Sequence, residues 1–232
     1  MLKFQERRLE PKWIGAVTGI VAILFLLGYF LFPGDPEIEP QTAISQGLKN
    51  TEQAKSYKYN IKMTTTIDGE QVVASNIKGD RERENRIHFS GKMFDSEVDF
   101  YLVDSTTFYK DQVTGEWTQI SNGEVNQQDI FMQEINPLAG FRYREITNSK
   151  FAGNEKIDGN NYWVFTADVS IVNPYMEILW KDFKCRFWLT PRSLLIKKAL
   201  ITGVGKEKPQ DKLDLMVEFS DFNKRIKVTP PK

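Results

Sequence analysis

The sequence predicts a mainly β domain of the α+β class, in which two apolar helices interrupt a long antiparallel sheet, attached to one N-terminal transmembrane helix. Residues 13–32 form an uncharged run that is long enough to cross a bilayer. From residue 56 onward, apolar and polar residues alternate in short runs, which is typical of strands with one buried face. Turn-forming pairs such as Asp68-Gly69 and Asp158-Gly159 separate these runs, and the continuous series of hairpins favours a single domain.

The predicted membrane anchor covers residues 13–32, which as a helix span about 30 Å, the thickness of the hydrocarbon core. Basic residues precede it and acidic residues follow it, so residues 1–12 are expected in the cytoplasm and the rest outside the cell. The bulky residues at its end do not fit a signal-peptide cleavage site, which favours an uncleaved, single-pass anchor in the cell membrane. Gly15 and Gly19 have the spacing that lets two helices approach closely, so a dimer through this face stays open as an alternative.

Composition excludes several kinds of partner and site. The chain has 31 basic and 31 acidic residues; without the four and two that precede residue 33, the outer part has 27 and 29, a net charge of −2. Such near-neutrality argues against a nucleic-acid partner. Cys185 is the only cysteine, which excludes an internal disulfide and thiol-based zinc sites; its strand setting predicts a small buried side chain. The outer part also lacks any Asn-x-Ser/Thr glycosylation acceptor. The lack of disulfides and the lack of such acceptors both favour a bacterial cell envelope.

The outer part is expected to begin with a tether and a short helix. Residues 33–40 contain three prolines and three acids, which predict a stiff, extended tether. The domain proper, 41–232, then opens with a weak helical stripe over 41–55. Strands are expected at 56–67, 72–79, 98–103, 106–110, 116–120, 150–157, 162–169, 184–189, 194–202, 213–219 and 226–228.

One hairpin can be predicted in more detail. Gly91-Lys92 suits a two-residue turn with glycine first, which places Phe89 opposite Phe94 and opposite charges on the other face. Asp95, Glu97 and Asp99 then share one strand face. A calcium site usually gathers six to eight oxygens from a folded loop, whereas a strand spreads these carboxylates about 7 Å apart. Pairing of the acids with Arg86 and His88 is therefore favoured over a metal site.

The two helical segments carry many of the large apolar side chains. Residues 124–147 have apolar residues at helical spacing up to Asn136-Pro137, and Asn173-Pro174 predicts a helix start that continues to residue 181. These side chains, with those on the inward faces of the strands, form either an ordinary core or the lining of an apolar cavity. The candidate cavity residues are Met63, Phe100, Phe108, Phe131, Met132, Phe165, Met176, Leu179, Trp180 and Phe187.

Several short strings follow one another in a characteristic order. They are Ser56-Tyr57-Lys58-Tyr59, Phe108-Tyr109-Lys110 followed by Trp117, Ile157-Asp158-Gly159-Asn160, Phe187-Trp188-Leu189 and Phe219-Ser220-Asp221-Phe222-Asn223. In this order the chain resembles the LolA/LolB-like half-barrels and the mycobacterial LppX/LprG lipoproteins over most of residues 41–231. The resemblance implies a strongly curved antiparallel sheet, with helices covering its concave face and acyl chains held between them. Members of these families are commonly soluble or lipidated at a cysteine. A transmembrane helix would keep this domain at the membrane, which argues against long-range transport.

Two functional hypotheses follow from these features. The first is a membrane-anchored extracytoplasmic module that binds a lipid or acylated molecule between the curved sheet and its helices. The alternative is an interaction or stress-sensing module that contacts an envelope protein with the same fold and carries no lipid. The sequence has no Gly-x-Ser-x-Gly elbow and no His-x-x-x-His pair, so we expect no enzymatic activity, no cofactor and no metal, with a hydrolase as a third alternative.

Overall fold

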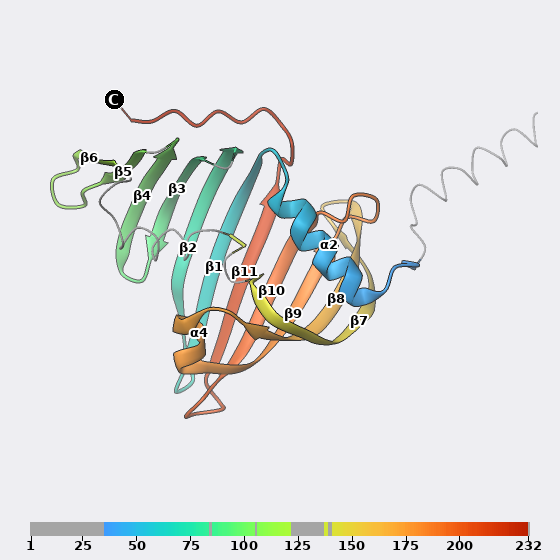
Figure 1. Ribbon diagram of the computed structural model, residues 1–232. Helices are drawn as coiled ribbons and strands as arrows, with labels where there is room; N and C mark the ends of the chain where they lie inside the picture. The colour runs from blue at the N-terminus through green and yellow to red at the C-terminus, as the bar shows by residue number, and fades with distance from the viewer. Residues whose placement is uncertain (1–34, 84, 105, 122–136, 139–140, 232) are drawn as a thin grey trace, which may run out of the picture.

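One antiparallel sheet dominates the described part of the chain (Figure 1). The computed structural model describes residues 35–83, 85–104, 106–121, 137–138 and 141–231. The elements are α2 (Pro40–Glu52), β1 (Tyr57–Ile67), β2 (Glu70–Arg83), β3 (Arg86–Met93), β4 (Ser96–Val103), β5 (Thr106–Lys110), β6 (Trp117–Ser121), β7 (Tyr143–Ile157), β8 (Asn160–Ile171), α4 (Pro174–Leu179), β9 (Trp180–Leu189), β10 (Ile196–Gly205) and β11 (Lys212–Ser220). Within these residues the 11 strands pair in the order β6-β5-β4-β3-β2-β1-β11-β10-β9-β8-β7. The sheet therefore consists of two meanders, joined where β1 pairs with β11.

Alternation along the strands decides which side chains are buried. In β1, Tyr57, Tyr59 and Ile61 are buried, while Lys58 and Lys62, which alternate with them, are exposed. Successive side chains of a strand point to opposite faces, and paired residues share a face. The apolar positions of neighbouring strands therefore meet in one core on the side of the sheet that faces α2.

Two hairpin turns confirm the predictions made from their residue pairs. Asp68 and Gly69 have φ angles of 51° and 87°, and Asp158 and Gly159 have φ angles of 49° and 81°. A two-residue hairpin turn with both φ values positive favours aspartate or asparagine followed by glycine. These turns fix the registers of β1 with β2 and of β7 with β8.

Helix α2 packs against the sheet near β7, β8 and β10, and the sheet curves around it (Figure 1). The Glu39 side chain accepts hydrogen bonds from the backbone N–H groups of Gln41 and Thr42, which caps the helix. Pro40 is the first helical residue rather than the end of the predicted tether, because its fixed φ suits that position. A Cβ at Gly47 would lie 2.7 Å from Leu189 Cδ2, so this glycine allows the helix to approach β9 closely.

The predicted Gly91-Lys92 turn is wrong. Gly91 lies inside β3, and the chain turns two residues later, after Met93, so Phe89 pairs with Phe100 rather than with Phe94. Gly91 has a φ of 148°, and a Cβ there would lie 2.2 Å from the carbonyl oxygen of Asn76. The glycine thus serves close contact with β2 and not a turn. Phe94, which the shorter hairpin placed inward, is 65% exposed.

Some other element boundaries also differ from the prediction. Strand β7 begins at Tyr143, well before residue 150, and α4 ends at Leu179, so that Trp180 belongs to β9. Residues 226–228 form no strand, since the Val228 backbone bonds to side chains instead.

Two predicted segments lie outside the described residues. They are the anchor at 13–32 and the greater part of the helical stretch around Phe131 and Met132. In the part of the chain that the structure does describe, no helix combines the length and the apolar character needed to cross a membrane.

Candidate functional site

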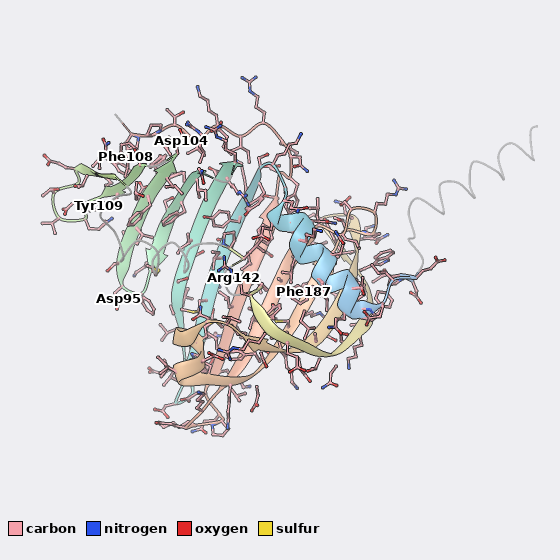
Figure 2. The ribbon with its side chains drawn as sticks, viewed as in Figure 1. Asp95, Asp104, Phe108, Tyr109, Arg142 and Phe187 are labelled. Atoms are coloured by element: carbon pink, nitrogen blue, oxygen red, sulfur yellow. The ribbon has the colours of Figure 1, made fainter. Side chains whose placement is uncertain are left out.

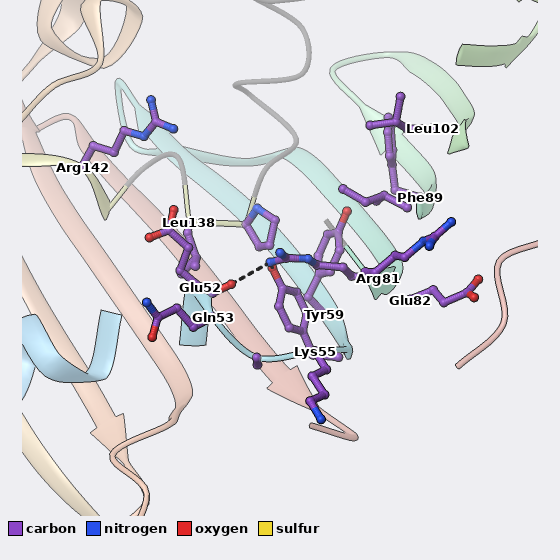
Figure 3. A pocket seen from close by; sticks show the side chains of 15 residues that line it. Glu52, Gln53, Lys55, Tyr59, Arg81, Glu82, Phe89, Leu102, Leu138 and Arg142 are labelled. Carbon is purple, nitrogen blue, oxygen red and sulfur yellow. Dashed lines mark hydrogen bonds between the residues drawn. The ribbon is translucent and has the colours of Figure 1, made fainter. Parts of the chain in front are cut away.

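A pocket of about 1030 Å³ lies where α2 ends and β1 begins (Figure 3). The α2–β1 connection forms one side of it, β1, β2, β3 and β4 form the floor, and the segment before β7 forms the remaining wall. Its described lining consists of Glu52, Gln53, Ala54, Lys55, Tyr57, Tyr59, Arg81, Glu82, Arg83, Ile87, Phe89, Leu102, Pro137, Leu138 and Arg142. The pocket lies on the same side of the sheet as the core, because Tyr57, Tyr59 and Phe89 belong to both.

The floor of the pocket is apolar and largely aromatic. Tyr59 and Phe89 are 5% and 1% exposed, and Phe89 stacks on Phe100 with ring centroids 5.1 Å apart. The Tyr59 ring lies across Gly79 of β2, where a Cβ would come within 2.1 Å of the ring. Burial raises the pKa of Tyr59, so this phenol stays neutral and the floor carries no charge. Leu102 adds an aliphatic surface from β4.

Arg81 of β2 forms the junction between the floor and the end of α2. Its Nη1 donates to the Tyr57 hydroxyl at 2.9 Å and to the Glu52 carbonyl at 3.1 Å, and its guanidinium carbon lies 5.1 Å from the centre of the Tyr57 ring. Burial raises the pKa of Tyr57, and the nearby Arg81 charge opposes that rise. The buried Nε of Arg81 makes no hydrogen bond within the described residues.

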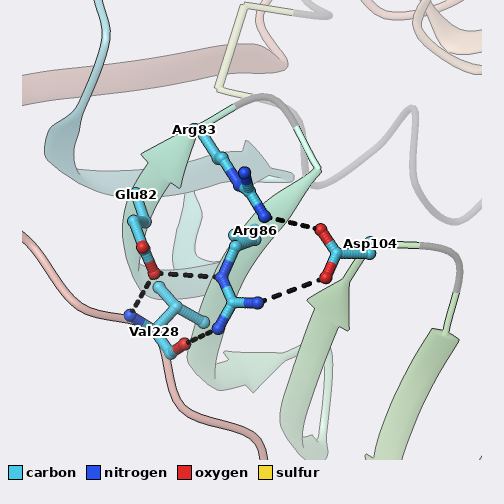
Figure 4. Close-up of polar contacts among 5 residues, drawn as sticks. All are labelled: Glu82, Arg83, Arg86, Asp104 and Val228. Carbon is cyan, nitrogen blue, oxygen red and sulfur yellow. Dashed lines mark hydrogen bonds and ion pairs between the residues drawn. The ribbon is translucent and has the colours of Figure 1, made fainter.

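Four charged side chains beside the pocket neutralise one another (Figure 4). Arg86 donates to Glu82 at 3.1 Å and to Asp104 at 3.2 Å, and Arg83 donates to Asp104 at 2.8 Å. The Val228 N–H donates to Glu82 at 2.8 Å, and the Val228 carbonyl accepts from Arg86 at 2.7 Å. The hydrogen bond from the Val228 N–H, supported by Arg86, holds the pKa of Glu82 below its usual range. This network fastens the C-terminal segment to β2 and β3 and leaves no net charge.

The remaining charges give the pocket a cationic rim, which we define as Lys55, Arg81 and Arg142. Figure 3 shows that the three side chains come from different segments: the α2–β1 connection, β2 and the segment before β7. Lys55 and Arg142 are exposed, and neither forms an ion pair with any other described residue. Outside the Glu82 network, Glu52 is the acidic residue of the described lining. The three rim cations and Glu52 together have a net charge of +2.

None of the described candidate cavity residues lines this pocket. Phe165 and Phe187 are fully buried, and Met176 and Trp180 are 8% exposed, so all four belong to the core. Leu179 is 62% exposed at the end of α4.

The remaining candidates are spread over both faces of the sheet. Met63 and Phe100 are partly buried against the core. Phe108 lies on the opposite face, because it pairs with Tyr101 while the adjacent Tyr109 pairs with Phe100. Phe131 and Met132 fall outside the described residues.

The sequence did contain a signal for the pocket. Arg81 follows Ile77 and Gly79 at a spacing of two, so strand alternation places it on the core face. The predicted strand stopped at Gly79, two residues before Arg81. Arg142 had no comparable signal, since its position depends on a segment far away in the sequence.

The other expectations for single side chains have mixed outcomes. Cys185 is 3% exposed, as predicted, and burial raises the pKa of its thiol to about 12. His88 contacts Asp99, with 2.9 Å between Nε2 and Oδ1, and stacks on Tyr101. Asp95 lies beyond the end of β3 (Figure 2), because the hairpin is longer than predicted.

Comparisons with known proteins identify the fold. The lipoprotein LppX of Mycobacterium tuberculosis aligns with a TM-score of 0.54 and 16% identity, over 81% of this chain and 97% of LppX. LprF of Mycobacterium bovis aligns with a TM-score of 0.51 and 14% identity, over 85% of this chain and 99% of LprF. A LolA superfamily protein of Nitrosomonas europaea aligns over 82% of this chain and 95% of its own, with 10% identity, but its TM-score of 0.30 is too low to carry an argument. No family model and no curated protein sequence matches the chain. The likeness shows an LppX-like fold.

Proposed function

We propose that this chain, with its LppX-like fold, is a membrane-anchored extracytoplasmic module that binds an apolar ligand, a lipid or an acylated molecule, on the concave face of its sheet. The observation that carries the proposal is the pocket of about 1030 Å³ with an aromatic floor on the core side of the sheet. Ligand pockets in proteins are commonly 300–1,000 Å³, so roughly this size suits a lipid-sized molecule.

The two parts of the sheet differ in a way that supports this proposal. We call β7 to β11 the closed half, because α2 packs there and residues such as Phe187 and Ile196 are fully buried. We call β2 to β4 the open half, because the pocket lies over these strands. Among the described residues, α2 thus covers this face of the sheet at one end, and the pocket lies over it at the other.

The N-terminal sequence supports a position at the membrane. Residues 13–32 have the length and apolar character of an anchor, and the described domain starts only a few residues later. A tether of about seven residues reaches at most roughly 20 Å, so the module would act close to the bilayer. We propose local lipid capture or presentation without enzymatic chemistry.

Native mass spectrometry of the full chain tests the proposal. The chain is expressed with its own membrane anchor, extracted in a mild non-ionic detergent and measured for bound species of several hundred daltons. We expect such a species in the wild type and its loss in Leu102→Asp, which puts a charge on the pocket floor. Val113→Asp is the matched control, because Val113 is 94% exposed and outside the pocket.

A second variant covers the case in which Leu102→Asp fails to fold. Leu102→Trp narrows the pocket without adding a charge, and it should reduce the bound species while the domain unfolds as the wild type does. An unliganded mass in the wild type would overturn lipid binding and favour the alternative, a module that contacts an envelope protein. Retention of the bound species in both Leu102 variants would show that the ligand lies elsewhere.

A further inference from the structure

The cationic rim places positive charge beside an apolar surface. Lys55, Arg81 and Arg142 line the same pocket as the apolar side chains of Tyr59 and Phe89. A fully apolar ligand would gain nothing from these charges, and it would cover the partly buried Arg81 without compensating its charge. The rim therefore points to a ligand with an anionic group at one end.

From this arrangement we infer that the ligand is an anionic amphiphile, with acyl chains on the aromatic floor and a phosphate or carboxylate at the rim. The inference rests on the proposed lipid binding and narrows its ligand class. The Glu82 network is neutralised internally, so it does not compete for the anion, whereas Lys55 and Arg142 have no ion-pair partner among the described residues. Arginine and lysine are also the side chains that recognise phosphate and carboxylate groups, by charge-assisted hydrogen bonds.

The position of Arg81 indicates which end of the pocket would hold the headgroup. Hydrogen bonds to the Tyr57 hydroxyl and the Glu52 carbonyl hold its guanidinium at the end of α2. Its buried Nε makes no hydrogen bond to a described residue, so the protein leaves this cation incompletely satisfied. A headgroup next to Arg81 would lie at the solvent side of the pocket, while the acyl chains extend over Phe89 and Leu102 of the open half.

Headgroup preference is the measurement that tests this inference. The full chain in non-ionic detergent is titrated with dioleoyl phosphatidylglycerol and with dioleoyl phosphatidylcholine, and bound fractions are read by native mass spectrometry. The two lipids share their acyl chains and differ in net charge. We expect phosphatidylglycerol to bind about tenfold more tightly, because charge-assisted hydrogen bonds to the rim form without an opposing choline charge.

Variants at the rim should change the preference and not the folding. Lys55→Gln combined with Arg142→Gln should bring the two lipids to within about twofold of each other, since most of the accessible positive charge is removed. Both side chains are exposed, so the core is not disturbed. Lys212→Gln combined with Arg225→Gln is the matched control, with two exposed cations outside the pocket, and should keep the full preference. Glu52→Gln, which removes the acid of the pocket lining outside the Glu82 network, should increase the preference.

The outcomes separate this inference from the proposed function. Equal binding of the two phospholipids by the wild type would overturn the anionic headgroup and leave lipid binding intact. Binding of neither phospholipid, nor of oleate as a single-chain carboxylate, would overturn the proposed function itself. Displacement of phosphatidylglycerol by millimolar inorganic phosphate would show a site for free anions and overturn the amphiphile. Loss of preference in the control pair would show that net charge, and not the rim, selects the headgroup.

Discussion

The closed half and the open half of the sheet bury the same face by different means. In the closed half, α2 and the strands exclude solvent completely from Phe165, Phe187 and Leu189. In the open half, Leu102 lines a pocket, and the charged Glu82–Arg86 network lies at its margin. Alternation along the strands is similar in both halves, so it does not explain the difference. Among the described elements, α2 packs only on the closed half, so the halves should respond differently to substitution.

The largest expected difference concerns two phenylalanines on the core face. Phe187→Ala should lower the free energy of unfolding by about 3–5 kcal/mol, because the cavity would form in a fully packed region. Phe100→Ala should cost only about 1–2 kcal/mol, since Phe100 is partly exposed at the edge of the core. Denaturant unfolding of the two variants measures this difference. Equal losses would show that the open half is as tightly packed as the closed half.

Gly79 allows a test inside the open half. Gly79→Ala should cost about 1–3 kcal/mol, because the new methyl group would displace the Tyr59 ring from the pocket floor. In a Tyr59→Ala background the same change should cost less than about 0.5 kcal/mol, since the obstructing ring is gone. A double-mutant cycle by denaturant unfolding measures the coupling. Additive costs would mean that Gly79 is needed for the backbone conformation of β2 and not to make room for the Tyr59 ring.

Cys185 tests the closed half by its response to alkaline pH. Burial raises the pKa of its thiol to about 12, above the usual value of 9.0, so the folded state binds the proton more tightly than the unfolded state. The resulting stability is complete below pH 9 and is lost between about pH 9 and 12, with roughly 1 kcal/mol lost from pH 9 to 10. Cys185→Ala should lack this part of the loss, as unfolding at a series of pH values would show. Parallel curves for the two proteins would contradict it.

The sequence predicted the sheet better than it predicted the site. Asp68-Gly69 and Asp158-Gly159 form turns because of their local backbone geometry alone, so the sequence could predict both turns. The use of Gly91 depends on a carbonyl of β2, and the hairpin prediction failed because nothing local distinguishes a turn glycine from a close-contact glycine. The pocket needs α2, β2 and Arg142 together, and such long-range placement leaves no periodic signal along the chain.

The smallest predicted effect concerns Glu82 in the open half. Its contribution to stability is lost at acidic pH, whereas the contribution of Cys185 in the closed half is lost at alkaline pH. The Val228 N–H, supported by Arg86, lowers the pKa of Glu82, so its stabilising contribution is present above pH 4.5, its usual pKa, and is lost as the pH falls through the lowered value. The Glu82 side chain is partly exposed, so the contribution should be less than about 1 kcal/mol. Compared with the wild type, Glu82→Gln should lose less stability between pH 6 and about pH 3. Glu97→Gln is the control, because Glu97 is exposed on β4, and its curve should follow the wild type. If Glu82→Gln also follows the wild type, the Glu82 carboxylate does not stabilise the open half, and the C-terminal segment is held by the hydrogen bond from Arg86 to the Val228 carbonyl and by the burial of Val228.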